Sequence, residues 1–289
     1  MKPFFSVIIP AFDAAETLCD TLRSVEAQTF GNYEVILIND GSRDESGQIM
    51  AAFREAHPGE RIQIVEQKNK GLGYSRNQGA QAAQGDWLAW LDADDLWHPQ
   101  KLANCAEFLQ ASPEGEWLYH PFIAFSENER RQRKAYPLKK LSELLSKGNP
   151  LTPSASLVKR ELALAFPFSE NPDFHGAEDL HLWIRLLAAG HQPLFWPEAL
   201  TEYRLEGGMS SRLEEHLQKT LNVLQHFYRE GYYLQSDLEK ARRRKYYEAG
   251  RHFHKHNNHA LANRYYSAAD AKSVKLLGMR FLNLLGIKW

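Results

Sequence analysis

Acidic and amide side chains follow each of four short apolar runs in the first hundred residues. Asp13 follows the first run, Asn39 and Asp40 the second, Asn69 the third, and the triplet Asp92, Asp94 and Asp95 the fourth. If the runs are parallel strands, their carboxyl ends meet at one edge of the sheet, where open α/β proteins bind ligands. Aspartate and asparagine also cap helices and form turns. Such a structural role is enough to explain Asp13 when it is taken by itself. One turn does not need three carboxylates, and converging carboxylates repel unless a cation or ligand donors neutralise them.

The pair Asp92 and Asp94 is suited to a hard divalent cation such as Mn²⁺ or Mg²⁺. One or two carboxylates hold such a cation while substrate phosphates complete its shell, and the cation neutralises a diphosphate leaving group. Other phosphate-binding motifs do not fit. Gly71-Leu72-Gly73 begins a dinucleotide fingerprint, but Arg76 stands where its third glycine is required, and no G-x-x-x-x-G-K-[ST] loop occurs. The sequence therefore disfavours dehydrogenases and P-loop NTPases.

Strands and helices, which differ in the spacing of their apolar residues, must position these side chains. Continuous apolar runs predict buried strands at 4–9, 33–39, 61–66 and 87–91, and helical patterns occupy 14–28, 44–57 and 73–84. This alternation predicts an α/β fold of the doubly wound kind, with a parallel sheet covered by helices on both faces. Further along the chain, 100–109 and 177–189 are predicted as helices and 116–126 as one strand.

The last part of the chain has a different pattern. Residues 211–289 are helical in period almost throughout, so we expect a helical region after a domain of residues 1–210. Residues 249–251 and 265–269 resemble a single helical hairpin of tetratricopeptide type. From Lys272 onward, four cations and no acid accompany apolar residues at helical spacing, which predicts a basic amphipathic helix. Such a helix either docks on the preceding hairpin or contacts a membrane surface, and amphipathicity alone does not decide between them.

Composition excludes several classes of protein. Lysine and arginine number 35 against 36 acidic residues, a formal net charge of −1, which argues against a nucleic-acid binder that works through overall positive charge. No apolar run approaches the roughly 18 residues that span a bilayer, and the first run is too short for a signal-peptide core. We therefore expect a cytoplasmic protein without a nucleic-acid partner. The two cysteines, Cys19 and Cys105, are both expected to be small buried hydrophobes.

Six motifs in a fixed order carry a resemblance to a known family. They are Ser6–Ala11, Glu34–Ser42, Asn69–Gly71 with Ser75–Gly79, Gly85-Asp86 through Leu91–Asp95, Gly176–Asp179, and Tyr203-Arg204. Over residues 3–210 the chain resembles a family 2 glycosyltransferase of GT-A fold. The resemblance implies an inverting enzyme that uses a nucleotide diphosphate sugar, usually UDP-linked, with Mn²⁺ or Mg²⁺.

The resemblance also implies which residues bind the donor. Pro10, Ala11 and Asp13 border the nucleotide, Asp40 hydrogen bonds the base, and Asn69, Arg76 and Asn77 lie near the base, ribose and phosphates. A carboxylate that accepts from a ring N–H selects uracil or thymine over cytosine. In the Asp92-Ala93-Asp94 motif, Asp94 is the favoured metal ligand and Asp92 lies nearer the ribose and sugar. Many members of the family have Asn where this chain has Asp13, which leaves the role of Asp13 open.

Two further segments match the family's catalytic and closing motifs. By resemblance, Asp179 is the general base that takes the proton from the acceptor hydroxyl, and Glu178 orients the acceptor, or the two exchange roles. The alternative explanation is that both acids complement the dipole of the helix that they begin. Tyr203 and Arg204, with Ser210 and Ser211, resemble the segment that closes over the diphosphate.

The sequence hypothesis is thus a glycosyltransferase that acts on a glycan or lipid-linked acceptor, in bacterial cell-surface polysaccharide assembly. We expect it in the cytoplasm, or at the inner face of the plasma membrane through its C-terminal helix. Two alternatives stay open. One is a nucleotidyl or sugar-phosphate transferase on a related fold, which would use the metal but need no base at Asp179. The other is an inactive scaffold whose C-terminal helices bind a partner.

Overall fold

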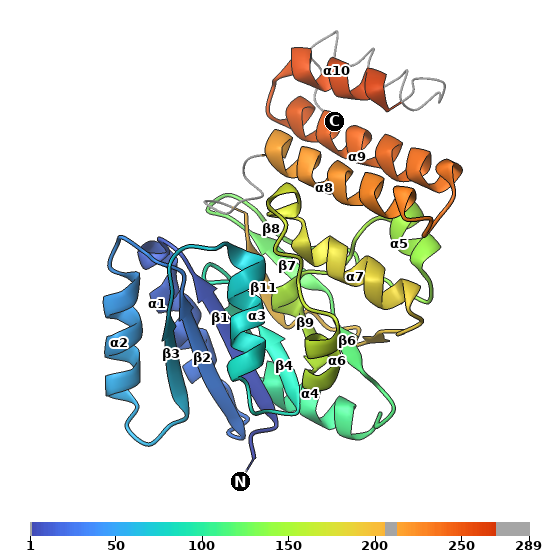
Figure 1. The fold of residues 1–289 in the computed structure, drawn as a ribbon. Helices are drawn as coiled ribbons and strands as arrows, with labels where there is room; N and C mark the ends of the chain where they lie inside the picture. The colour runs from blue at the N-terminus through green and yellow to red at the C-terminus, as the bar shows by residue number, and fades with distance from the viewer. Residues whose placement is uncertain (1, 206–212, 270–289) are drawn as a thin grey trace. The chain divides into compact units, whose positions relative to one another are not determined.

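The computed structural model describes residues 2–205 and 213–269 of the chain (Figure 1). These residues form two compact units. Residues 2–140 and 150–205 belong to the first, and residues 141–149 and 213–269 belong to the second. Residues 141–149 thus join the helical unit, although the sequence placed them inside the first domain. The basic amphipathic helix expected after Lys272 lies outside the described residues, as do Ser210 and Ser211.

The first unit is built on a seven-stranded sheet whose strand order is β10-β6-β9-β4-β1-β2-β3. Its strands are β1 (Phe5–Ala11), β2 (Tyr33–Asn39), β3 (Ile62–Glu66), β4 (Trp87–Trp90), β6 (Trp117–Tyr119), β9 (Ser156–Lys159) and β10 (Leu194–Phe195). β9 runs antiparallel to both of its neighbours, and the other pairs are parallel. This agrees with the mostly parallel sheet that the resemblance to a GT-A fold predicts. Ala11 pairs with Asn39, so the polar residues that follow β1 and β2 emerge at the same edge.

A second sheet of four strands lies in the same unit, in the order β5-β11-β7-β8. Its strands are β5 (Leu96–Trp97), β11 (Thr201–Arg204), β7 (Phe122–Phe125) and β8 (Arg130–Gln132). The prediction of one strand over 116–126 is therefore wrong. The segment divides at His120-Pro121 into β6 of the large sheet and β7 of the small one. Proline has no backbone N–H to donate to a ladder, which favours such a break.

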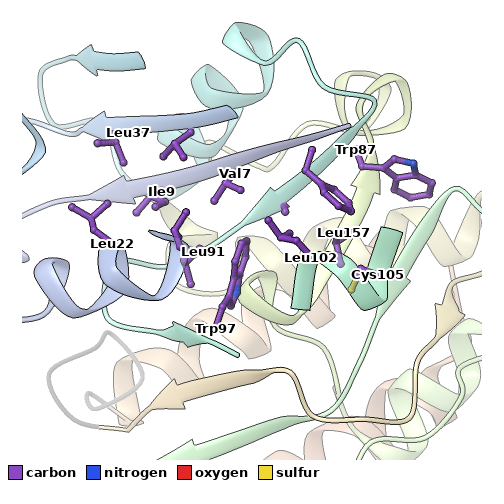
Figure 2. Close-up of a cluster of buried hydrophobic side chains, with 14 of the residues drawn as sticks. Val7, Ile9, Leu22, Leu37, Trp87, Leu91, Trp97, Leu102, Cys105 and Leu157 are labelled. Atoms are coloured by element: carbon purple, nitrogen blue, oxygen red, sulfur yellow. The ribbon is translucent and has the colours of Figure 1, made fainter. Parts of the chain in front are cut away.

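Helices cover both faces of the large sheet. α1 (Ala15–Glu26), α2 (Ser46–Ala56) and α4 (Lys101–Gln110) contribute to one core cluster, which includes Val7 and Ile9 of β1 (Figure 2). Side chains alternate along a strand, so Ile8 faces the other way, against α3 (Leu72–Ala82). Cys105 of α4 is buried in the cluster as expected, whereas Cys19 is exposed on α1, which corrects that prediction.

Four further elements complete the first unit. They are α6 (Arg160–Ala165), α7 (Glu178–Ala188) and the 3₁₀ turns Pro153–Ala155 and Pro172–Phe174.

The second unit is helical. It contains α5 (Leu141–Lys147), α8 (Leu213–Arg229), α9 (Gln235–Lys255) and α10 (His259–Ala268), and α9 packs against the other three. The expected hairpin is present: a β-carbon on Gly250 of α9 would lie 2.5 Å from the Tyr266 ring of α10. Among the residues that the structure describes, no helix is both long and apolar enough to cross a membrane.

Gly85 allows the chain to enter β4 directly beside β1. A β-carbon there would lie 2.7 Å from the Phe5 carbonyl carbon and 2.8 Å from the Ser6 nitrogen. β1 is held between β2 and β4 and has no room to move. We expect Gly85→Ala to lower the free energy of unfolding by about 2 kcal/mol in urea titrations, as is typical of overpacking. Gly31→Ala is the control, because nothing lies within 4 Å of its β-carbon position. Equal stability of the two variants would contradict this account of the packing.

Candidate active site at the carboxyl edge of the sheet

Asp40, which follows β2, organises the loop after β3. Its carboxylate accepts hydrogen bonds from the Lys70 N–H (2.9 Å), the Gly71 N–H (2.9 Å) and the Gln67 amide (2.7 Å). Asp40 is only 4% exposed. The structure thus shows Asp40 as the anchor of residues 67–71, which places the exposed Asn69 at the edge of the site.

The end of β1 is fastened to the same region through Asp13. Asp13 has a φ of +48°, and its carboxylate accepts from the Arg43 N–H at 2.7 Å. Aspartate and asparagine are the non-glycine residues that tolerate this backbone region. The Asn that the family resemblance leads one to expect here would fit the same backbone, so the difference requires no change of the turn. Pro10 and Ala11, which precede it, are buried and paired with Ile38 and Asn39.

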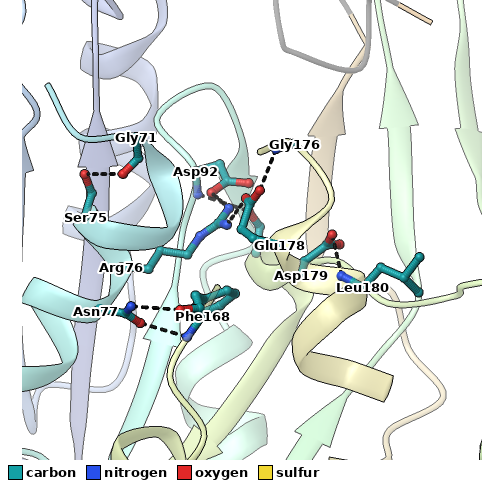
Figure 3. Close-up of polar contacts among 11 residues, drawn as sticks. Gly71, Ser75, Arg76, Asn77, Asp92, Phe168, Gly176, Glu178, Asp179 and Leu180 are labelled. Carbon is teal, nitrogen blue, oxygen red and sulfur yellow. Dashed lines mark hydrogen bonds and ion pairs between the residues drawn. The ribbon is translucent and has the colours of Figure 1, made fainter. Parts of the chain in front are cut away.

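The buried guanidinium of Arg76 joins two other predicted site residues (Figure 3). Arg76 of α3 is 2% exposed and donates to Asp92 after β4 (2.6 Å) and to Glu178 of α7 (2.7 Å). Burial opposes the charge of the guanidinium, but the two carboxylates outweigh it and raise the pKa of Arg76 above its ordinary value. Arg76 therefore connects the turn after β4 to the start of α7 through its two terminal nitrogens.

Asn77, the next residue, is engaged with the chain itself. Its side-chain amide donates to the Phe168 carbonyl (3.0 Å) and to Glu170 (2.9 Å), and its oxygen accepts from the Phe168 N–H (2.8 Å). The structure thus gives Asn77 the task of holding residues 168–170 beside α3. Nothing in the sequence pattern indicated this partner.

Asp92 and Asp94 lie on the turn that follows β4, with the buried Ala93 between them. The Ala93 carbonyl accepts from the hydroxyls of Thr17 (2.8 Å) and Thr21 (2.9 Å), which fixes the turn against α1. Burial, followed by the nearby charge of Asp92, raises the pKa of Asp94 to about 6. Among the described residues, no other residue donates a hydrogen bond to the Asp94 carboxylate.

These two carboxylates fit a divalent cation. A bound cation would offset the repulsion by Asp92 that contributes to the raised pKa of Asp94, and one or two carboxylates with substrate phosphates are usual for Mg²⁺-type sites. Within residues 2–205 and 213–269, no three side chains of the kinds that bind metals gather at one point. The remaining ligands would therefore be donor phosphate and water.

Asp95, the third acid of the turn, was not assigned a role from the sequence. It is fully buried and accepts from the Arg204 N–H at 3.0 Å, while the Arg204 guanidinium donates to the Asp94 carbonyl at 3.0 Å. Burial and the neighbouring acids raise the pKa of Asp95 well above its ordinary value. The predicted Tyr203-Arg204 segment on β11 thus lies against the turn formed by Asp92–Asp95.

Glu178 and Asp179 begin α7 but differ in surroundings. Glu178 is 3% exposed and bonded to Arg76 and to the Gly176 N–H (2.6 Å), whereas Asp179 is half-buried and accepts only from the Leu180 N–H among the described residues. Burial, followed by the charge of Glu178, raises the pKa of Asp179 to about 7. A carboxylate with such a pKa is suited to accept a proton near neutral pH.

The sequence matches a defined family over much of this unit. Residues 6–163, more than half of the chain, match the sequence model of glycosyl transferase family 2. An amylovoran biosynthesis glycosyltransferase of Erwinia amylovora is 32% identical over 215 residues, which cover 70% of this chain and 69% of the relative. An uncharacterized glycosyltransferase of Nostoc is 33% identical over 58% of this chain, and the chain spans only 54% of that relative's length.

Solved structures share the fold at low sequence identity. A mannosyltransferase from Pyrobaculum calidifontis, in complex with GDP-Man and Mn²⁺, superposes with a TM-score of 0.67 at 19% identity, covering 99% of this chain and 80% of that one. TarS 1–349 of S. aureus, in complex with UDP-GlcNAc, gives a TM-score of 0.62 at 15% identity, covering 99% and 89%. Together with the matched family model, the fold and the motif positions show that the chain belongs to glycosyl transferase family 2, with a GT-A fold.

Proposed function

We propose that this chain is an inverting, metal-dependent glycosyltransferase of bacterial polysaccharide biosynthesis. It would move a sugar from a nucleotide diphosphate sugar, UDP-linked by preference, to a hydroxyl of a glycan or lipid-linked saccharide. The observation that carries the proposal is the buried Arg76, which holds Asp92 of the donor turn and Glu178, next to Asp179, at a fixed separation. The polysaccharide-related names among its relatives support the setting.

The donor side is formed by the ends of β1, β2 and β4 and by the loop after β3. We assign the nucleotide to the surface around Pro10, Ala11, Asp13, Asp40 and Asn69. A divalent cation on Asp92 and Asp94 would supply neutralisation of the diphosphate charge. Because Asp40 already accepts three hydrogen bonds, base recognition by its carboxylate would use its remaining acceptor capacity. Neighbours of this fold carry either UDP-GlcNAc or GDP-Man, so the choice of base is the finer part of the proposal.

The chemical step belongs to Asp179. As the acceptor oxygen forms its bond to the anomeric carbon, its proton passes to the Asp179 carboxylate. The bond to the diphosphate breaks, and the diphosphate leaves with the electron pair, so the configuration inverts. Glu178 is a weaker candidate for the base, because its carboxylate is held by Arg76 and the Gly176 N–H.

The acceptor and the location rest on the sequence alone. A lipid-linked acceptor would bring the enzyme to the inner face of the plasma membrane, with the C-terminal basic segment as the contact. That segment lies outside the described residues, so the membrane contact stays a prediction.

The metal assignment is tested with Asp94→Asn. We expect Mn²⁺-dependent release of nucleoside diphosphate from one member of a UDP-, GDP- and dTDP-sugar panel, and a loss on the order of 100-fold in the variant, because the metal contributes several kcal/mol. Asp86→Asn is the control, since Asp86 precedes β4 at the opposite edge of the sheet and pairs with Lys2. Turnover that is independent of Mn²⁺ and unchanged in Asp94→Asn would exclude the assigned site.

The base assignment is tested by pH dependence. The pKa of Asp179 is raised to about 7, so its carboxylate is protonated and inactive below that pH. We expect kcat/KM to rise with pH up to about 7 and to level off above it. Asp179→Asn should lower turnover by about 10²- to 10⁴-fold, the usual contribution of a general base, while UDP·Mn²⁺ binding is unchanged.

Glu178→Gln provides the matched comparison. This change removes the neighbouring negative charge that helps to raise the pKa of Asp179. The pH at which kcat/KM of the Glu178→Gln variant rises should therefore be lower than in the unsubstituted chain. If Asp179→Asn instead retains full turnover, a transferase that needs no base at this position becomes the better description.

A further inference from the structure

A fully buried lysine lies close to the turn Asp92–Asp95. We call this turn the metal turn, because the proposed function places the cation on it. Lys101 of α4 is 0% exposed, and its ammonium lies 2.7 Å from the Ser154 carbonyl, 2.9 Å from His120 Nε2 and 3.0 Å from the Thr201 hydroxyl. A buried charge is costly unless hydrogen bonds satisfy it. No catalytic or binding role in the proposed function uses these residues.

Lys101 is the donor in each of its side-chain hydrogen bonds. His120 Nδ1 lies 2.7 Å from the Pro121 carbonyl and must donate to it, so Nε2 accepts from Lys101. The Thr201 hydroxyl donates to the Ser154 carbonyl at 2.9 Å and therefore also accepts from Lys101. All three ammonium protons thus have acceptors, which accounts for a lysine at this position.

Ser154 is where this buried network converges. Its carbonyl accepts from Lys101, from Thr201 and from the indole of Trp97 at 2.8 Å. These donors come from α4, β11 and β5, and Ser154 itself lies on the 3₁₀ turn Pro153–Ala155. A residue held from three elements has little freedom to move.

The hydroxyl of Ser154 contacts the metal turn directly. It accepts from the Asp92 N–H at 3.0 Å. The turn is therefore held at Asp92 by Ser154 and at Asp94 and Asp95 by Arg204. Thr201 and Arg204 lie on the same strand, so both contacts depend on β11.

We propose that Ser154, held in place by Lys101, is a positioning residue that sets the geometry of Asp92 and Asp94 for the divalent cation. The inference rests on the proposed metal site and deepens it. Ser154 touches neither donor nor metal in this assignment and acts through the backbone of Asp92. Outer contacts of this kind alter metal affinity by roughly 10- to 100-fold when they are removed.

The test is Mn²⁺ affinity, measured by electron paramagnetic resonance of free Mn²⁺ in the presence of UDP. We expect Ser154→Ala to weaken Mn²⁺ binding by about tenfold, the lower end of that range. Ser156→Ala is the matched control. Ser156 is equally buried two residues away, and its hydroxyl donates to the Thr152 carbonyl at 2.8 Å rather than to the metal turn. Ser156→Ala should bind Mn²⁺ like the unsubstituted chain.

Thermal unfolding of both variants accompanies the titration, and Ser154→Thr, which keeps a hydroxyl, should restore part of the affinity. Equal Mn²⁺ affinity in Ser154→Ala and the unsubstituted chain would overturn the inference and leave the proposed function standing. Equal losses in Ser154→Ala and Ser156→Ala would also overturn it, because the effect would then follow general stability. If the unsubstituted chain binds no Mn²⁺ with UDP, the metal site of the proposed function fails, and this inference fails with it.

Discussion

The site depends on one buried ion-paired cation. Arg76 is almost completely enclosed and shares its guanidinium between Asp92 and Glu178, which come from the turn after β4 and from α7. Removing one partner of such a group leaves an uncompensated buried charge, which costs about 3–5 kcal/mol. The guanidinium is rigid and planar, so it fixes the separation of its two carboxylates as well as their charge. The turn after β4 and the start of α7 are thereby held at one distance from each other.

The four acids around Arg76 consequently divide into two kinds. Asp92 and Glu178 form ion pairs with the guanidinium, and Glu178 also accepts a hydrogen bond from the Gly176 N–H. Asp94 and Asp179 have no ion-pair partner among the described residues, and burial is the main cause that raises their pKa values, to about 6 and about 7. Carboxylates in different surroundings can take different roles within one site. The sequence motifs contain all four acids but do not show which of them pair with Arg76.

The parts of the fold that could be predicted are those with local causes. Continuous apolar runs located β1 to β4, and the shared edge of parallel strands brought Asp40, Asn69 and Asp92 together. The break at Pro121 was missed because the apolar pattern continues through it, although its two halves join different sheets. Asn77 was expected near the donor, but its partners are at residues 168–170, far along the chain. Lys101 and Ser154 carry no motif at all, because their roles arise only from tertiary contacts.

The distinction between supporting and reactive acids also bears on whether the chain is an inert scaffold. Arg76, Asn77 and Asp40 satisfy partners in the fold, so their presence would be expected in an inactive relative as well. Asp94 and Asp179 are different, because burial raises their pKa values. A carboxylate whose pKa is higher in the folded chain than in the unfolded chain lowers the stability of the fold when it is ionised. A chain selected for stability alone would gain by replacing them, since strained or unsatisfied groups persist mainly where function needs them. The presence of these two acids, each within two residues of a carboxylate that Arg76 binds, is the physical argument for catalysis.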